Sequence, residues 1–193
     1  MRGFIRLTTR SRKGREMRIL SLSILVALAT SCGTQQPLME RGAEYLQPLK
    51  AQLQSELKAG MAKGVGAAIE VCRVRAPEIA ADLQTDSVEM GRTSHRLRNP
   101  GNETRPWVEP LLAGYLADPG NARPQIVRLG DGRVGYLEPI VTQPLCLACH
   151  GSTIAQPVRE KIEELYPSDR AIGFETGDIR GVFWVEMPEQ AAP

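Results

Sequence analysis

Cys146-Leu147-Ala148-Cys149-His150 is the stretch that decides how the rest of this sequence is interpreted. Its form is C-x-x-C-H, the attachment pattern of a c-type haem. The two thiols, three positions apart, can bond to the two vinyl groups of one porphyrin, and the imidazole that follows can bind the iron. The stretch therefore predicts a fold built around one haem, covalently bound through Cys146 and Cys149, with His150 as an iron ligand.

Two other chemistries use a C-x-x-C pair, and neither has support elsewhere in the sequence. A redox-active disulfide of the thioredoxin type needs a βαβ context, and none is evident around residues 139–151. A zinc site needs two further ligands, and the sequence has no second C-x-x-C and no pair of histidines at zinc-binding spacing. The haem interpretation is therefore favoured.

The composition allows one domain with a real core behind a basic leader. The chain has 193 residues, of which 42% are hydrophobic. Residues 1–31 hold seven of the 24 Lys and Arg residues but only one of the 22 acidic residues, so the remainder carries 17 basic and 21 acidic residues. A domain with net negative charge is a poor match to nucleic acid, so we expect no nucleic-acid partner.

Residues 1–31 are predicted to be a signal peptide of the lipoprotein type, with Met17 as an alternative start. A basic segment precedes an apolar run, residues 19–29, which is too short to span a bilayer. The end of the leader, Leu28-Ala29-Thr30-Ser31-Cys32, resembles a bacterial lipobox, so we expect a lipid on Cys32; ordinary cleavage that leaves Cys32 a plain thiol is the alternative. These features predict a periplasmic protein anchored to a membrane, by default the outer membrane because Gly33 is not an aspartate.

The mature chain is expected to begin with a flexible tether, residues 32–40, and to end with a tail, residues 189–193. The domain between them, residues 41–188, starts with apolar residues at spacings of three or four, which predicts one long helix with a single buried stripe. The stripe consists of Leu46, Leu49, Leu53, Leu57, Met61, Val65, Ile69, Cys72 and Ala76. Pro77 then ends or kinks this helix.

Later segments predict strands, so the expected fold class is α+β. The strands are residues 87–93, 125–129, 135–141 and 181–187, and the last is apolar enough to be central. Asp131-Gly132, between the second and the third, is a hairpin signal. This hairpin leads directly into the C-x-x-C-H motif. Short helices are expected at residues 109–116 and 157–165.

The remaining cysteines and histidines limit the choice of a second iron ligand. The chain has four cysteines and two histidines. The lipid accounts for Cys32 and the haem for two more, which leaves Cys72 without a partner and on the apolar stripe. His95 is the other imidazole. Cys72, His95 and a methionine all stay open as the sixth ligand at this point.

A basic loop follows the first predicted strand. Its residues Arg92, Arg96 and Arg98, with Asn99, are either a solvated surface or a clamp for the haem propionates, because guanidinium groups match carboxylates. Trp107 either lies against the porphyrin or fills the core. The haem-binding set predicted from the sequence therefore extends to these five residues.

Several segments together resemble the PAS-like single-haem c-type domains of bacteria and cyanobacteria, which also occur as the sensing part of some histidine kinases. The matching segments are Ala68 to Cys72 with Ala76-Pro77, Arg92-Thr93-Ser94, Arg98-Asn99-Pro100 with Asn102 and Trp107, Cys146 to Gly151, and Tyr166-Pro167 through Gly181. The resemblance implies a PAS-like antiparallel sheet with a long N-terminal helix and flanking helices around the haem. It also implies that His150 and Cys72 are the two axial ligands of the iron.

The expected function is that of a redox or diatomic-gas sensor, and the alternative is a single-electron carrier. A thiolate ligand stabilises ferric iron, and its bond weakens on reduction, which would open a site for CO or NO. A sensor would need a separate signalling protein, and a carrier would need a redox partner. No enzymatic activity is expected, because a peroxidase would need a distal base and His95 is the sole candidate.

Overall fold

The computed structural model describes residues 30–190, with side chains from residue 35 onwards, and residues 35–190 belong to one compact unit. Residues 1–29 of the predicted signal peptide and the side chain of Cys32 lie outside the described residues, as do residues 191–193 of the predicted tail.

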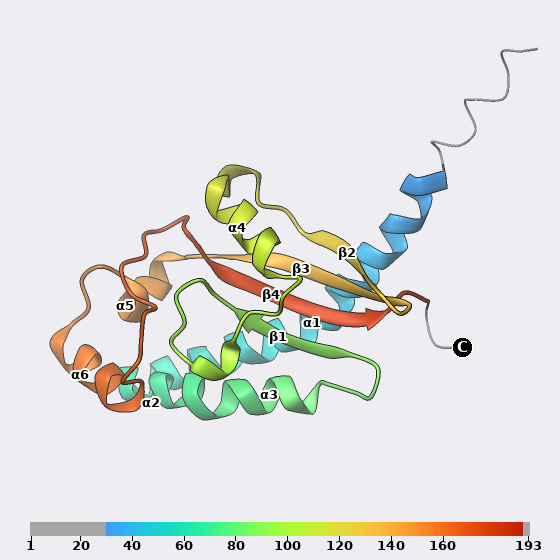
Figure 1. Cartoon of the computed structure of the whole chain (residues 1–193). Helices are drawn as coiled ribbons and strands as arrows, with labels where there is room; N and C mark the ends of the chain where they lie inside the picture. Colours follow the sequence, from blue (N-terminus) through green and yellow to red (C-terminus); the bar gives the residue numbers. More distant parts are fainter. Residues whose placement is uncertain (1–29, 191–193) are drawn as a thin grey trace, which may run out of the picture. The chain divides into compact units, whose positions relative to one another are not determined.

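A four-stranded antiparallel sheet forms the middle of the unit (Figure 1). Its strands are β1 (Glu89–Thr93), β2 (Gln125–Gly130), β3 (Arg133–Val141) and β4 (Ile179–Pro188), in the order β1-β4-β3-β2. The α+β class with an antiparallel sheet is confirmed, and β4 is an inner strand as its apolar sequence predicts. The β2–β3 hairpin turns at Asp131 and Gly132, which have φ angles of 48° and 77°. Glycine and aspartate tolerate this left-handed conformation, so the local sequence fixes the turn.

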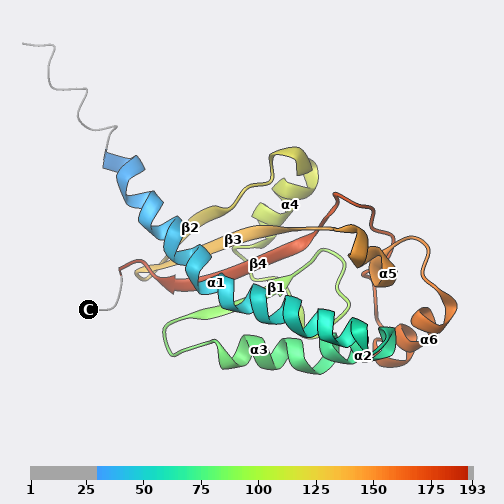
Figure 2. The same ribbon diagram turned by 180° about the vertical axis from the view of Figure 1, so that it is seen from behind.

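The predicted long stripe forms a helical hairpin rather than one helix. Helix α1 (Thr30–Ala62) is followed by α2 (Val65–Glu70), a π-helical turn η1 (Val71–Arg75) and α3 (Ala76–Asp82). The chain turns at Gly64, whose φ of 109° is open to glycine but strained for other residues. Seen from behind, α3 lies beside α1 across one face of the sheet (Figure 2). The periodic stripe therefore continues through a change of direction that periodicity does not reveal.

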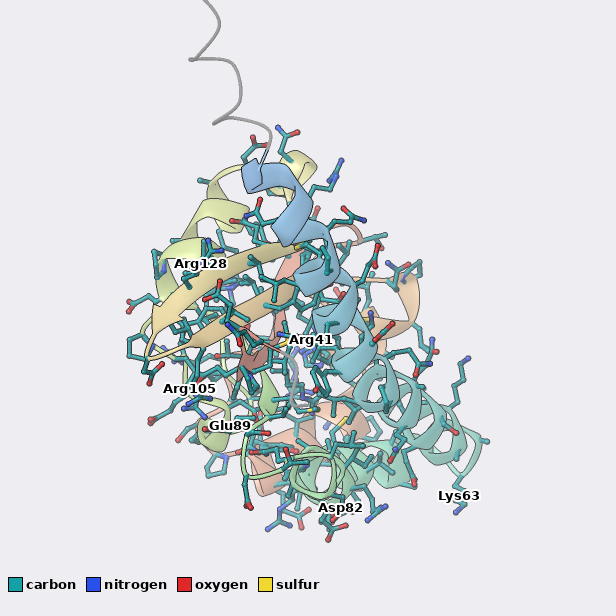
Figure 3. The ribbon with its side chains drawn as sticks, turned by 90° about the vertical axis from the view of Figure 1, so that its right-hand side faces the viewer. Arg41, Lys63, Asp82, Glu89, Arg105 and Arg128 are labelled. Carbon is teal, nitrogen blue, oxygen red and sulfur yellow. The ribbon has the colours of Figure 1, made fainter. Side chains whose placement is uncertain are left out.

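The structure differs from the expected tether at residues 35–40. These residues belong to α1, and Leu38 is buried in the main core with Leu46 and Leu49. Arg41 also fastens this helix to the end of β4, because its Nη2 donates to the carbonyl of Glu189 at 3.0 Å (Figure 3). The packed part of α1 therefore begins about one helical turn before the predicted domain boundary, because Leu38 is apolar and buried.

The two faces of the sheet carry separate cores. Val185 and Met187 of β4 pack against α1 and α3, whereas Val182 and Trp184 face α4 (Glu109–Ala117), because side chains alternate along a strand. A third apolar cluster joins α2 to α6 (Gln156–Leu165) at the end of the sheet where the short helix α5 (Leu147–His150) lies (Figure 1). The cysteine and histidine motif is thus held between these helices and the sheet.

No helix within residues 30–190 is long and apolar enough to cross a membrane.

Substitution of Gly42 tests how closely α1 packs on the sheet. A Cβ at Gly42 would lie 2.7 Å from the Cβ of the buried Tyr136, so Gly42→Ala should lower the free energy of unfolding by about 1–2 kcal/mol, although alanine is the better helix former. Gly66→Ala is the matched control, because nothing lies within 4 Å of its position, and it should raise stability by about 0.5–1 kcal/mol. Chemical denaturation measures both, and equal stabilisation by the two substitutions would contradict the packing.

Candidate cofactor site

The C-x-x-C-H motif folds as a tight helical turn directly after strand β3. A 3-10 turn (Pro144–Cys146) leads into α5, and the Cys146 amide donates to the Gln143 carbonyl at 2.9 Å. Pro144 is suited to the first position of such a turn because its missing N–H would have no partner there. The turn places Cys146, Cys149 and His150 in the lining of an open cleft.

Cys72, in the π-helical turn, lines the same cleft. The amide of Ala76 donates to the carbonyl of Val71, five residues earlier, which is the wide turn of a π-helix. Pro77 follows and cannot donate to the carbonyl of Arg73, so a regular α-helix would be broken at the same place. π-Turns often occur at functional sites. The structure therefore brings together the two motif cysteines, His150 and Cys72, and all three thiols are free.

The imidazole of His150 is held in one tautomer. Its Nδ1 lies 2.7 Å from the carbonyl oxygen of Ala171, which can only accept, so Nδ1 carries the proton and Nε2 has the free lone pair. Burial, reinforced by the positive charges of Arg180 and Arg98, lowers the pKa of His150 to about 2. The ring is therefore neutral at neutral pH and is oriented as metal-binding histidines usually are.

The residues of the predicted clamp differ in whether their side chains already bond to other parts of the protein. Arg92, Arg96, Arg98 and Asn99 all line the cleft. Arg98 also forms a two-point ion pair with Asp169, with distances of 3.1 Å from Nε to Oδ1 and 3.0 Å from Nη2 to Oδ2. Because Nε and Nη2 are engaged in this way, only Nη1 of Arg98 is left for the clamp role, which stays a prediction.

Arg96 and Asn99 are also partly engaged in shaping the loop. Arg96 donates from Nη1 to the carbonyl of Ile172 at 3.0 Å, and its guanidinium lies 4.8 Å from the ring centre of Phe174. The Oδ1 of Asn99 accepts from the amide of Gly101 at 2.9 Å. Both side chains therefore hold the wall of the cleft in place as well as facing it.

Arg180, at the start of β4, is a cleft residue that the sequence analysis missed. Burial and the neighbouring charge of Arg92 lower the pKa of Arg180 to about 10, so it stays charged at neutral pH. Over residues 35–190, neither the Arg92 nor the Arg180 side chain has a hydrogen-bond or ion-pair partner. Two sequence signals could have pointed to Arg180: it is a charged residue next to the apolar run of residues 181–185, and it lies in the last segment of the family resemblance. Two positive groups thus face the cleft without an acceptor.

Trp107 does not belong to the cleft, which corrects its predicted role against the porphyrin. Its Nε1 donates to Glu186 at 2.7 Å, and its ring covers Gly135, where a Cβ would approach to 2.8 Å. It is partly buried and packs against the cluster on the α4 face of the sheet. Arg105 and Glu89, labelled in Figure 3, form an ion pair on the neighbouring surface. The placement of Trp107 agrees with the alternative interpretation, in which it packs in the core.

His95 is not among the residues that line the cleft, although its neighbours Ser94 and Arg96 are. Its ring makes an edge contact with Phe174, with 5.7 Å between ring centres. Its Nδ1 is buried and has no hydrogen-bond partner among the described residues. His95 is therefore not placed to compete with Cys72 as a ligand. Within residues 30–190, no three or more His, Cys, Asp or Glu side chains group as a metal site of their own.

Comparison with known proteins gives two matches. The family model described as Tll0287-like matches residues 18–188. The crystal structure of the cyanobacterial haem protein Tll0287 is similar in fold, with a TM-score of 0.55 and 24% sequence identity, over 86% of this chain and 100% of that chain. No curated protein matches the sequence significantly.

The half-buried His95 gives a pH dependence that can be measured. Burial, reinforced by the charge of Arg96, lowers the pKa of His95 below its usual 6.5, against an opposing effect of Asp178. Below that pH the unfolded chain binds the proton more readily than the folded one, so stability is full above pH 6.5 and falls as the pH decreases. His95→Gln should make this acid slope shallower in denaturation titrations from about pH 8 to pH 5. An unchanged slope would place the acid sensitivity elsewhere.

Proposed function

The chain belongs to the Tll0287-like family, and from this premise we propose that it is a c-type haem protein. One haem would be bonded to Cys146 and Cys149, and its iron would be held by His150 and Cys72. The observation that carries the proposal is the convergence of these four side chains, from segments more than 70 residues apart, on one cleft. The neutral His150 ring, with Nε2 left free, supplies the donor that such an iron requires.

The propionates of this haem would be held by Arg92 and Arg180. Both line the cleft, and neither is neutralised by a protein acceptor in the described residues. A guanidinium group forms two parallel hydrogen bonds with a carboxylate, and a buried positive charge is stabilised when an anion joins it. Arg180 therefore joins the arginines that the sequence analysis predicted for this clamp.

The ligand arrangement favours a sensor, with single-electron transfer as the alternative. Bound haem supplies one-electron redox chemistry, and a thiolate ligand favours the ferric state. Cys72 belongs to the turn between α2 and α3, whereas His150 belongs to α5, so one iron would connect two separate parts of the fold. Loss of the Cys72 bond on reduction would free the helical hairpin from α5 and open a position for CO or NO, which is the two-state element that a sensor needs.

Electron transfer is supported by one separate feature. Leu145 lines the cleft next to Cys146 and is 53% exposed, so an apolar contact surface adjoins the proposed haem. Such a surface suits brief contact with a redox partner protein. A sensor would instead signal to a separate protein. Neither role requires enzymatic activity, and we propose none.

The proposed location is the periplasm, with a lipid on Cys32 holding the protein on a membrane, by default the outer membrane. The sequence of the leader supports this location. Haem attachment through C-x-x-C-H is consistent with export. The tether originally expected after Cys32 would be short, because the packed part of α1 includes Leu38.

The identity of the sixth ligand is the first test of the proposal. Protein purified from a host competent in haem attachment should have the mass of the polypeptide plus one haem, and its ferric EPR spectrum should be low-spin with thiolate character. Cys72→Ala should abolish that spectrum, because it removes the thiolate. Met61→Leu is the matched control, since Met61 also lines the cleft and methionine is an alternative ligand. An unmodified mass would overturn haem attachment, and a thiolate spectrum that persists in Cys72→Ala would exclude Cys72.

Arg180→Gln tests the propionate site separately. Reduction makes the haem more negative, so loss of a nearby positive charge should lower the midpoint potential, by about 59 mV for each tenfold change in the equilibrium constant of a one-electron couple. Arg159→Gln, at an exposed position on α6, is the control and should leave the potential unchanged. A redox titration compares the three proteins. Equal potentials in wild type and Arg180→Gln would remove Arg180 from the propionate site.

A further inference from the structure

The Arg98–Asp169 ion pair is the best-satisfied polar group at the cleft, although it is not part of the proposed ligand set. Its side chains are only 11% and 8% exposed. Besides Asp169, the Nη2 of Arg98 donates to the carbonyl of Cys149 at 2.6 Å and reaches that of Ala171 at 3.3 Å. One guanidinium group therefore connects the β1 loop, helix α5 and the segment after α6.

Asp169 continues this network to the proposed iron ligand. Its Oδ1 accepts from the amide of Ala171 at 2.9 Å, and the carbonyl of the same Ala171 accepts the proton on Nδ1 of His150. The ion pair thus contacts both the amide and the carbonyl of Ala171, the residue that orients the imidazole. We propose that Arg98 and Asp169 are positioning residues for His150, which fix its tautomer and set how strongly it donates to iron.

The surrounding segment gives this network a rigid support. Residues 169–174 run alongside the end of α5, where the amides of Gly173 and Phe174 donate to the carbonyls of Gly151 and His150 at 3.1 and 3.0 Å. The amide of Arg170 donates to the carbonyl of Leu97 at 2.9 Å. Backbone hydrogen bonds therefore hold the residues on both sides of Ala171 in place. Arg98 is the side chain that links the two segments to which these residues bond.

The inference deepens the proposed function, and its redox consequence rests on it. A strong hydrogen bond from Nδ1 to a carbonyl gives the imidazole more anionic character, which makes it a better donor and favours ferric iron. If Arg98 or Asp169 loses its geometry, the Ala171 carbonyl is held less firmly and the hydrogen bond weakens. The midpoint potential should then become more positive.

Arg98→Lys is the decisive substitution, because it keeps the charge and removes the fork. A lysine can contact Asp169 or the Cys149 carbonyl, but it cannot form two parallel bonds with the carboxylate. Any change in the properties of His150 then reports on positioning rather than on lost charge. Asp169→Asn is the second variant, since its amide oxygen can still accept from the Ala171 amide while the ion pair is lost.

The direct measurement is solvent exchange of the Nδ1 proton of His150, followed by NMR in the diamagnetic ferrous protein saturated with CO. Arg98→Lys should accelerate this exchange relative to wild type, because the hydrogen bond that protects the proton is weakened. The midpoint potential should rise, with about 59 mV for each tenfold change in the relative affinity of the ligand for the two iron states. The backbone amide of Val185, buried in β4, serves as the internal reference for overall stability.

The controls separate positioning from stability and from haem binding itself. Glu164→Gln breaks an exposed ion pair with Lys161 and should alter neither the exchange nor the potential. If Arg98 and Asp169 act as one unit, the double variant should shift both readouts no further than the larger single effect. Unchanged Nδ1 exchange in both single variants, with wild-type haem content, would overturn the inference and leave the proposed function standing. If wild type carries no haem, the proposed function fails, and the same exchange measured on the full haem-free chain still tests the positioning.

Discussion

The hydrogen bond between Nδ1 of His150 and the carbonyl of Ala171 is the constraint on which the site depends. It decides which nitrogen of the ring is free, and it can form only if the segment after α6 returns to the end of α5. That return is held by the Arg98–Asp169 pair and by backbone bonds from residues 173 and 174 to 150 and 151. The fold fixes the amide and carbonyl partners, so the orientation of the His150 ring does not depend on a cofactor. Cofactor binding therefore requires little further ordering of this side chain.

The helical hairpin supplies another part of the cleft lining, including Met61, Ile69 and Cys72. Gly64 reverses the chain after α1, and the close contact at Gly60, where a Cβ would lie 2.9 Å from the Cα of Ala68, lets α2 lie tightly against it. The π-turn then carries Cys72 into the cleft ahead of Pro77. Two residues that interrupt helices, Gly64 with its positive φ and Pro77, thus determine the position of the Cys72 thiol. The apolar stripe of α1 meanwhile buries Leu46 and Leu49 against the sheet, so the hairpin rests on the main core rather than on the cofactor.

Local sequence signals were sufficient for the strands and for the Asp131-Gly132 turn, because each follows from short-range periodicity or backbone preference. They failed where the answer depends on a partner far along the chain. Arg98 and Arg180 are chemically identical, but Arg98 pairs with Asp169, 71 residues later, whereas Arg180 has no acceptor in the described residues. Trp107 likewise packs over Gly135 and donates to Glu186. The PAS-like resemblance singled out Cys72 and His150, which do line one cleft, but it carried no information on which arginine was already paired.

This division of the arginines has an electrostatic consequence for the cleft. The charge of Arg98 is paired with that of Asp169, and both side chains are nearly buried. The pKa of Arg180 is instead lowered, first by burial and then by repulsion from Arg92, because neither of these two arginines has an acidic partner in the described residues. In the polypeptide alone, this repulsion and the removal of a guanidinium group from water both cost free energy. A ligand with two carboxylates would lower both costs. The same cleft offers thiols and a neutral imidazole on its apolar walls. A flat apolar molecule with two acidic groups at one edge satisfies all of these demands at once, and haem has that distribution of chemistry.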